Sequence, residues 1–166
     1  MSNIKIERLK DVVKRTTFNL DRSHRGDIVI FTLGLAGEIY EAIEIYQQPE
    51  HDKMAFQAEL ADITWYTIAT ALLLPSDNID DLVLTEKPFP GSKTEGLEVL
   101  HKALYKAVEH QEKVKKFIRD YPDRPFDYLL GYAEPLREIN RFFDITDACD
   151  LIELKCRKRF PERYLP

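Results

Sequence analysis

Cysteine, glycine and long apolar segments are scarce in this chain, and each scarcity excludes a class of protein. The 166 residues include two cysteines and six glycines. Cys149 and Cys156 stand seven residues apart, which on a helix separates them by about 10 Å, too far for a disulfide. We therefore expect free thiols in a reducing cytoplasm. No charged leader with an apolar region opens the chain. No apolar run approaches the roughly 18 residues of a membrane span, so neither export nor membrane insertion is expected.

Basic residues are almost absent from one long segment of the chain. Residues 26–86 include twelve acidic residues and one basic residue, Lys53, for a net charge of −11, while the rest of the chain carries +6. Acidic residues on a solvated helix usually alternate with Lys or Arg that pair with them. We therefore expect an acidic region that binds a cation, with basic groups supplied by the flanks. The overall charge of −5 argues against stable binding to nucleic acid.

Alternating apolar and polar residues, the pattern of a half-buried strand, are also missing from the sequence. Apolar residues recur at helical spacing instead, so we predict an all-α helical bundle formed as one domain over residues 1–166. Asp52 is predicted to cap one helix, and Ser92 and Glu95 have the spacing of a capping box. Pro135 is expected to kink or divide another helix. The helices are expected at about 3–19, 27–47, 53–74, 94–120, 126–143 and 146–160.

Two pairs of carboxylates lie inside the most apolar of these segments. Glu38 and Glu41 form the first pair, spaced i, i+3, and Glu59 and Asp62 form the second. Residues three apart share a helix face with Cβ atoms about 5–6 Å apart, so two neighbouring helices could bring four carboxylates together. Such a cluster is costly to desolvate without a cation, and Mg²⁺ prefers oxygen ligands. A single pair of this spacing is more often solvated, but no Lys or Arg accompanies either pair here. Glu44 is either an outer ligand or a solvated residue.

The same residues carry a resemblance to a known family. The chain reads GLAGEIYEAIE at residues 34–44, ELADITWY at 59–66 and KCRKRFP at 155–161. These segments resemble the E-x-x-E, E-x-x-D and K-L-x-x-R-Y-P motifs of the MazG-like, all-α nucleoside triphosphate pyrophosphohydrolases. Residues 84–146 match only loosely and look like an inserted or divergent helical stretch. Cys156 stands where the family usually has Leu, and the Asn that many members carry shortly before the motif's Lys is missing.

The resemblance implies a hydrolase that cleaves the α–β phosphoanhydride of an NTP or dNTP, giving a nucleoside monophosphate and pyrophosphate. It implies a catalytic role for Glu38 or Glu41, which would orient or deprotonate the attacking water. It also implies a homodimer or homotetramer. The implied cofactor is Mg²⁺, with Mn²⁺ as an alternative, held by Glu38, Glu41, Glu59 and Asp62.

Substrate contacts are expected from basic and aromatic side chains. Lys155 and Arg159 lie in the terminal motif and are expected to bind phosphate. Arg25, just ahead of the acidic helix, could close over the substrate. Trp65, the only tryptophan, is either a core residue or a platform on which the base stacks. The other basic candidates, each either a phosphate contact or a solvated residue, are Arg22, His24 and the i, i+4 pairs Lys102 with Lys106 and Arg137 with Arg141.

The carboxylates have two other interpretations. A ferritin-like di-iron bundle needs two Glu-x-x-His motifs, and the chain has one, at Glu98 and His101. A non-enzymatic alternative is a helical regulatory or assembly module whose acidic residues hold a structural cation. Mg²⁺-dependent turnover of a triphosphate would distinguish the enzyme from the module.

Overall fold

The computed structural model describes residues 2–17, 25–74, 91–124 and 131–164. These residues form helices and contain no strand, so the all-α prediction is confirmed. The elements are α1 (Ser2–Thr16), α2 (Arg25–Tyr46), α3 (Lys53–Leu73), α4 (Lys93–Asp120), α5 (Glu134–Asn140), α6 (Ala148–Arg159) and the 3₁₀ turn η2 (Pro161–Tyr164).

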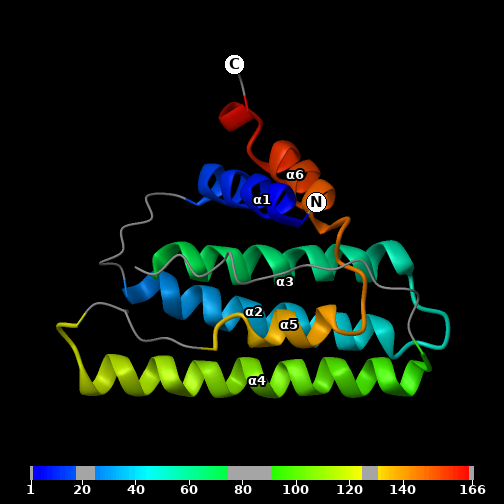
Figure 1. Ribbon diagram of the computed structural model, residues 1–166, viewed down its shortest axis with the longest axis horizontal. Helices are drawn as coiled ribbons and strands as arrows, with labels where there is room; N and C mark the ends of the chain where they lie inside the picture. The colour runs from blue at the N-terminus through cyan, green and yellow to red at the C-terminus, as the bar shows by residue number, and fades with distance from the viewer. Residues whose placement is uncertain (1, 18–24, 75–90, 125–130, 165–166) are drawn as a thin grey trace.

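The helix α3 lies at the centre of the arrangement (Figure 1). It packs on one side against α2, which in turn packs against α4, and α5 lies against α4. On the other side α3 carries α1 and α6, which also contact each other. The central position of α3 explains why its residues are mostly apolar, because a helix with neighbours on several sides has little solvated surface. Leu60, Ile63 and Ile68 of α3 are all fully buried.

The helix ends follow the expected chemistry in two places. The Asp52 carboxylate accepts hydrogen bonds from the backbone N–H groups of Met54 and Ala55, at 2.8 and 3.1 Å. Ser92 and Glu95 form the capping box at the start of α4. These caps satisfy N–H groups that have no partner within the helix, which fixes where α3 and α4 begin.

The helix expected at 126–143 was placed wrongly. Residues 126–130 lie outside the described residues, and residues 131–133 form a turn in which Gly131 has a φ of 101°. The helix α5 begins at Glu134 and ends at Asn140, so Pro135 neither kinks nor divides a helix. It stands in the first turn, where the missing N–H of proline costs no hydrogen bond.

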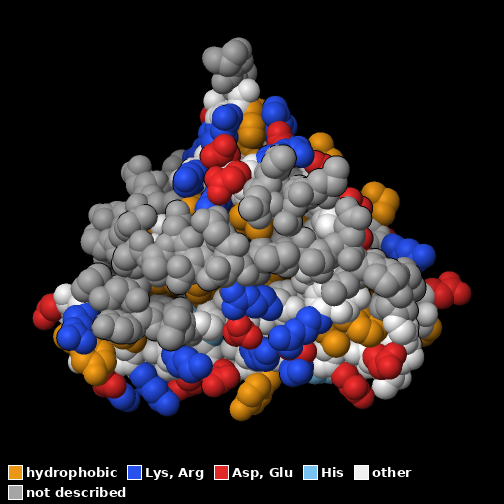
Figure 2. All heavy atoms as spheres, viewed as in Figure 1, with side chains coloured by type: hydrophobic (Ala, Val, Ile, Leu, Met, Phe, Trp, Pro, Cys, Tyr) orange, Lys and Arg blue, Asp and Glu red, His pale blue; other side chains and the backbone are white. Residues whose placement is uncertain are grey.

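One of the basic pairs, Lys102 with Lys106, joins α4 to α5. The carboxylate of Glu138, 5% exposed, forms ion pairs with Lys102, Lys106 and Arg141 at 2.8 to 3.0 Å. Burial would raise the pKa of Glu138, but the hydrogen bonds from Lys102 and Lys106 outweigh it and hold the pKa below its usual range. Arg137 pairs with Glu134 at 2.8 Å. Figure 2 shows Lys and Arg side chains gathered over α4 and α5. Lys102 and Lys106 thus hold α4 to α5, whereas Arg137 and Arg141 pair with acidic residues of α5 itself.

No described helix combines the length and the apolar character needed to cross a membrane.

Two glycines of α2 give a matched test of the packing between α2 and α3. A Cβ at Gly34 would stand 2.3 Å from Cε1 of Tyr66 in α3, whereas a Cβ at Gly37 would meet nothing within 4 Å. We expect Gly34→Ala to lower the free energy of unfolding by about 1–3 kcal/mol, because the tyrosine ring must move. We expect Gly37→Ala to raise it by about 0.5–1 kcal/mol, because alanine restricts the unfolded chain.

Urea denaturation measures both changes. Equal effects of the two substitutions would contradict the close approach of α2 and α3 at Gly34.

Candidate functional site

Three of the four predicted metal ligands converge where α2 packs on α3. Carboxylate oxygens of Glu38, Glu41 and Glu59 all lie within 4.8 Å of one another. Glu38 and Glu59 are half-buried, and Glu41 is exposed. Gly34 permits this arrangement, since without a side chain it lets α2 approach the ring of Tyr66 on α3.

Two carboxylates of this cluster, those of Glu38 and Glu59, resist ionisation. The pKa of Glu38 is raised from 4.5 to about 8, first by burial, then by its hydrogen bond with Glu59 and by the charges of Asp62, Glu59 and Glu41. Burial also raises the pKa of Glu59, and the charges of Asp62 and Glu41 add to that rise. Like charges at this separation in a partly dry site cannot all ionise without a compensating cation.

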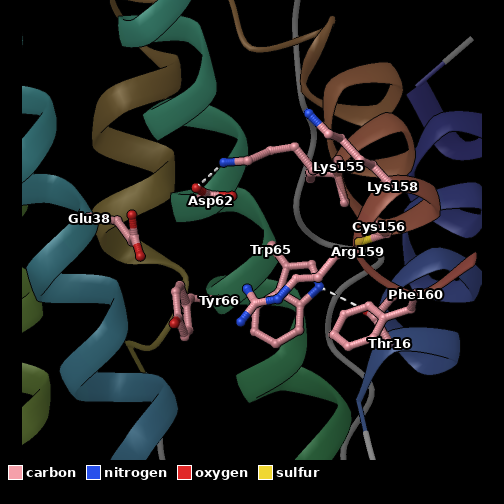
Figure 3. A pocket seen from close by; sticks show the side chains of 11 residues that line it. Thr16, Glu38, Asp62, Trp65, Tyr66, Lys155, Cys156, Lys158, Arg159 and Phe160 are labelled. Atoms are coloured by element: carbon pink, nitrogen blue, oxygen red, sulfur yellow. Dashed lines mark hydrogen bonds and ion pairs between the residues drawn. The ribbon is translucent and has the colours of Figure 1, made fainter.

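Asp62, the fourth predicted ligand, is not part of the three-residue cluster. Its carboxylate forms an ion pair with the Lys155 ammonium group, which reaches across from α6 (Figure 3). Its charge nevertheless acts on the Glu38 carboxyl. Asp62 therefore stands between the carboxylate cluster and the basic residues of α6.

A pocket of about 600 Å³ adjoins the cluster, between α3 and α6. Glu38, Asp62 and Tyr66 form one end of it, which we call the carboxylate end (Figure 3). Lys155, Lys158 and Arg159 of α6 add cations to its wall. The other end, which we call the aromatic end, is formed by Thr16, Trp65, Cys156 and Phe160.

Trp65 packs against the core and also lines the pocket. Its indole packs edge-on against Phe31 and Tyr66, with ring centroids 5.6 and 5.0 Å apart. It also lines the pocket, where its Nε1–H donates to the Thr16 hydroxyl at 3.1 Å. The ring is half-buried, so it can pack against the core and still present surface to a ligand.

Both basic residues predicted from the terminal motif line the pocket. Lys155 is engaged with Asp62, and the Arg159 guanidinium lies 5.6 Å from the centroid of the Phe160 ring. Arg25 begins α2, but its side chain lies outside what the structure describes. The predicted contacts at Arg22 and His24 also fall outside the described residues.

Glu44, the acidic residue whose role was open, is exposed and accepts a hydrogen bond from the Tyr40 hydroxyl at 3.1 Å. It does not belong to the cluster of Glu38, Glu41 and Glu59. The geometry therefore favours the solvated role.

Sequence reasoning missed Thr16, Lys158 and Tyr66 as pocket residues. Tyr66 had a signal, because it belongs to the segment that resembles the E-x-x-D motif. Lys158 stands one residue before Arg159, and its position in that terminal motif was its signal. Thr16 had none, since it closes a helix that bears no motif and reaches the pocket only through packing.

The raised pKa of Glu38 predicts how stability depends on pH without a metal. A carboxyl whose folded pKa lies above its unfolded value stabilises the fold fully below the unfolded pKa and loses that contribution as pH rises through the folded one. We therefore expect the free energy of unfolding in EDTA to fall between about pH 5 and pH 8, following the rise from 4.5 to about 8. Glu38→Gln should flatten this fall and make the protein more stable than wild type above pH 8.

Chemical denaturation at a series of pH values measures this dependence. Glu44→Gln, which neutralises an exposed acid on the same helix, is the matched control and should leave the pH profile of wild type unchanged. An unaltered profile in Glu38→Gln would contradict the assigned crowding of carboxylates.

Comparison of the chain with protein-family models, with curated proteins and with solved structures found no match. The resemblance to the MazG-like pyrophosphohydrolases rests on the segments at 34–44, 59–66 and 155–161. All three segments contribute residues to the pocket or to the carboxylate cluster beside it.

Proposed function

We propose that this protein is a Mg²⁺-dependent nucleotide pyrophosphohydrolase of the MazG-like type. It would cleave the α–β phosphoanhydride of an NTP or dNTP to a nucleoside monophosphate and pyrophosphate. The observation that carries the proposal is the convergence of Glu38, Glu41 and Glu59 beside a pocket whose wall also holds basic side chains. Carboxylates that would bind a metal ion thus lie next to basic side chains that would bind phosphate.

The donor set fits Mg²⁺, or Mn²⁺ in its place. Glu38, Glu41 and Glu59 offer hard oxygen ligands within 4.8 Å of one another, and burial of Glu38 and Glu59 makes a bound cation favourable. Asp62 would join them on release of Lys155. The ion, when bound, supplies charge neutralisation for the polyphosphate.

The roles of the two proposed catalytic carboxylates follow from their positions. Because Glu38 lines the pocket, we assign it the role of orienting the attacking water and accepting its proton. Glu41 is exposed, and its part is to complete the ligand set. Phosphoryl chemistry depends mainly on positioning and charge stabilisation, which these side chains provide.

The basic residues of α6 would hold the phosphates. Lys155 already bridges to the carboxylate end through Asp62, and Lys158 and Arg159 lie further along the same helix. A triphosphate reaching from Glu38 toward α6 would meet these three cations in turn. The free, buried Cys156 thiol beside them is consistent with the expected cytoplasmic location.

Pyrophosphate release from each NTP and dNTP, with and without Mg²⁺, tests the reaction. We expect Glu38→Gln and Glu59→Gln each to reduce kcat/KM by at least about 100-fold, because even residues that only support metal ligands contribute 10–100-fold. Glu44→Gln is the matched control and should retain activity near wild type. Circular dichroism verifies that each variant keeps its helices.

The rival interpretation, a regulatory or assembly module with a structural cation, predicts a different result. Mg²⁺ would then raise the melting temperature of wild type but not of Glu59→Gln, while no nucleotide would be hydrolysed. That combination would refute the enzyme.

Self-association is a further part of the proposal. Ile30, Leu33 and Tyr40, on the outward face of α2, are 59%, 57% and 53% exposed, and their spacing places them on one side of the helix. Apolar surface of this kind favours burial against a second subunit. We expect light scattering to give the mass of a homodimer or homotetramer, and Leu33→Glu to shift it toward the monomer. A monomeric wild type would refute the assembly without bearing on the reaction.

A further inference from the structure

The aromatic end of the pocket joins three helices that lie apart in the sequence. Thr16 is the last residue of α1, Trp65 lies on α3, and Cys156 and Phe160 belong to the end of α6 (Figure 3). Thr16 is 5% exposed, although its hydroxyl is polar. A buried hydroxyl in the wall of a ligand pocket either binds the ligand or binds the protein, and its partners decide which.

The partners of Thr16 are all within the protein. Its hydroxyl donates to the carbonyl oxygens of Val12 and Val13, at 3.1 and 3.0 Å, and accepts from Nε1 of Trp65 at 3.1 Å. The thiol of Cys156 is in hydrogen-bonding contact with the same side chain. The hydroxyl hydrogen of Thr16 and the indole N–H of Trp65 therefore already have hydrogen-bond partners within the protein.

The indole itself is held in place on several sides. Phe31 and Tyr66 meet it edge-on, both at interplanar angles of 87°, and Thr16 holds its nitrogen. Tyr66 turns its own ring toward Gly34 of α2, which places that hydroxyl at the carboxylate end. A fixed, half-exposed aromatic ring is suited to stacking against another flat ring.

The polar groups that remain near the aromatic end are charged and extend from the surface of α6. Lys158 and Arg159 are exposed side chains with long flexible stems, and cations of this kind suit the phosphates of a ligand. Among the described lining residues, the aromatic end thus presents no uncommitted hydroxyl or indole nitrogen at a fixed position. It can stack against the flat face of a ring, but it has no hydrogen-bonding group at a fixed position for the polar atoms on the edge of that ring.

We infer that Thr16 fixes Trp65 as a stacking wall for a nucleobase, and that this wall accepts all four bases because its own polar atoms are already bonded within the protein. The ligand class, a nucleotide, is taken from the proposed function. A site built to hydrogen-bond its ligand rejects an analogue that lacks the group by about 10⁴–10⁵-fold, whereas stacking tolerates every base. Thr16 is a positioning residue in this scheme.

The fluorescence of Trp65 provides the first test, because it is the only tryptophan of the chain. The full-length protein is titrated with dAMP, dGMP, dCMP and dTMP, and quenching of the emission gives each dissociation constant. We expect all four to quench, with constants that agree within about tenfold. A preference of about 1,000-fold for one base, or the absence of quenching by all four, would overturn the inference.

Substitutions at Thr16 provide the second test. Thr16→Val removes the acceptor for Trp65, so we expect it to shift the emission maximum and to weaken binding of all four nucleotides about threefold or more. Thr16→Ser keeps the hydroxyl and should bind as wild type does. Thr17→Val is the matched control, because Thr17 also donates to the Val13 carbonyl oxygen, at 2.8 Å. Unchanged binding by Thr16→Val would overturn the role of Thr16.

Trp65→Ala gives an independent measurement if Thr16→Val does not fold. Calorimetry should show that it weakens all four nucleotides by a similar factor, at least about fivefold. A loss confined to one base would overturn the inference.

Pyrophosphate release by the same preparations separates this inference from the proposed reaction. Uniform quenching without turnover supports the stacking wall and refutes the reaction, whereas turnover with a strong base preference refutes the wall alone.

Discussion

The crowding of carboxylates between α2 and α3 is the constraint on which the rest of this structure depends. Glu38, Glu41 and Glu59 are held within 4.8 Å of one another although their charges repel. Helix packing holds them there, and the two helices concerned are rich in apolar residues. Burial along α2 and α3 thus stabilises an arrangement that the acidic side chains oppose, and the raised pKa of Glu38 is the sign of that opposition.

The layer formed by α1 and α6 places a pocket beside this carboxylate cluster. It covers α3 on the side away from α2 and contributes basic side chains, whose charge is opposite to that of the carboxylate cluster. Lys155 links the two parts through Asp62, and Thr16 links α1 to Trp65. The ends of the chain therefore complete a site whose acidic half lies between them in sequence, as the distribution of charge along the chain anticipates.

Basic residues of identical spacing have different roles because of where their helices lie. Lys102 and Lys106 of α4 join that helix to α5 through the buried carboxylate of Glu138, and Arg141, at the end of α5, pairs with the same carboxylate. Lys155 and Arg159 have the same i, i+4 spacing but face the pocket. Spacing along a helix indicates which side chains share a face, but the neighbour that this face meets is a property of the tertiary fold.

The sequence by itself determined what is local: the helices, the caps at Asp52 and Ser92, and the two i, i+3 carboxylate pairs that share helix faces. It misplaced α5, because a proline fits the first turn of a helix as readily as it breaks one. Tertiary structure alone decided that Asp62 pairs with Lys155 and that Thr16 reaches Trp65. The reason is physical. Helical periodicity determines the helix face on which a residue lies, whereas packing determines which helix that face meets and which residues along the two helices lie opposite each other.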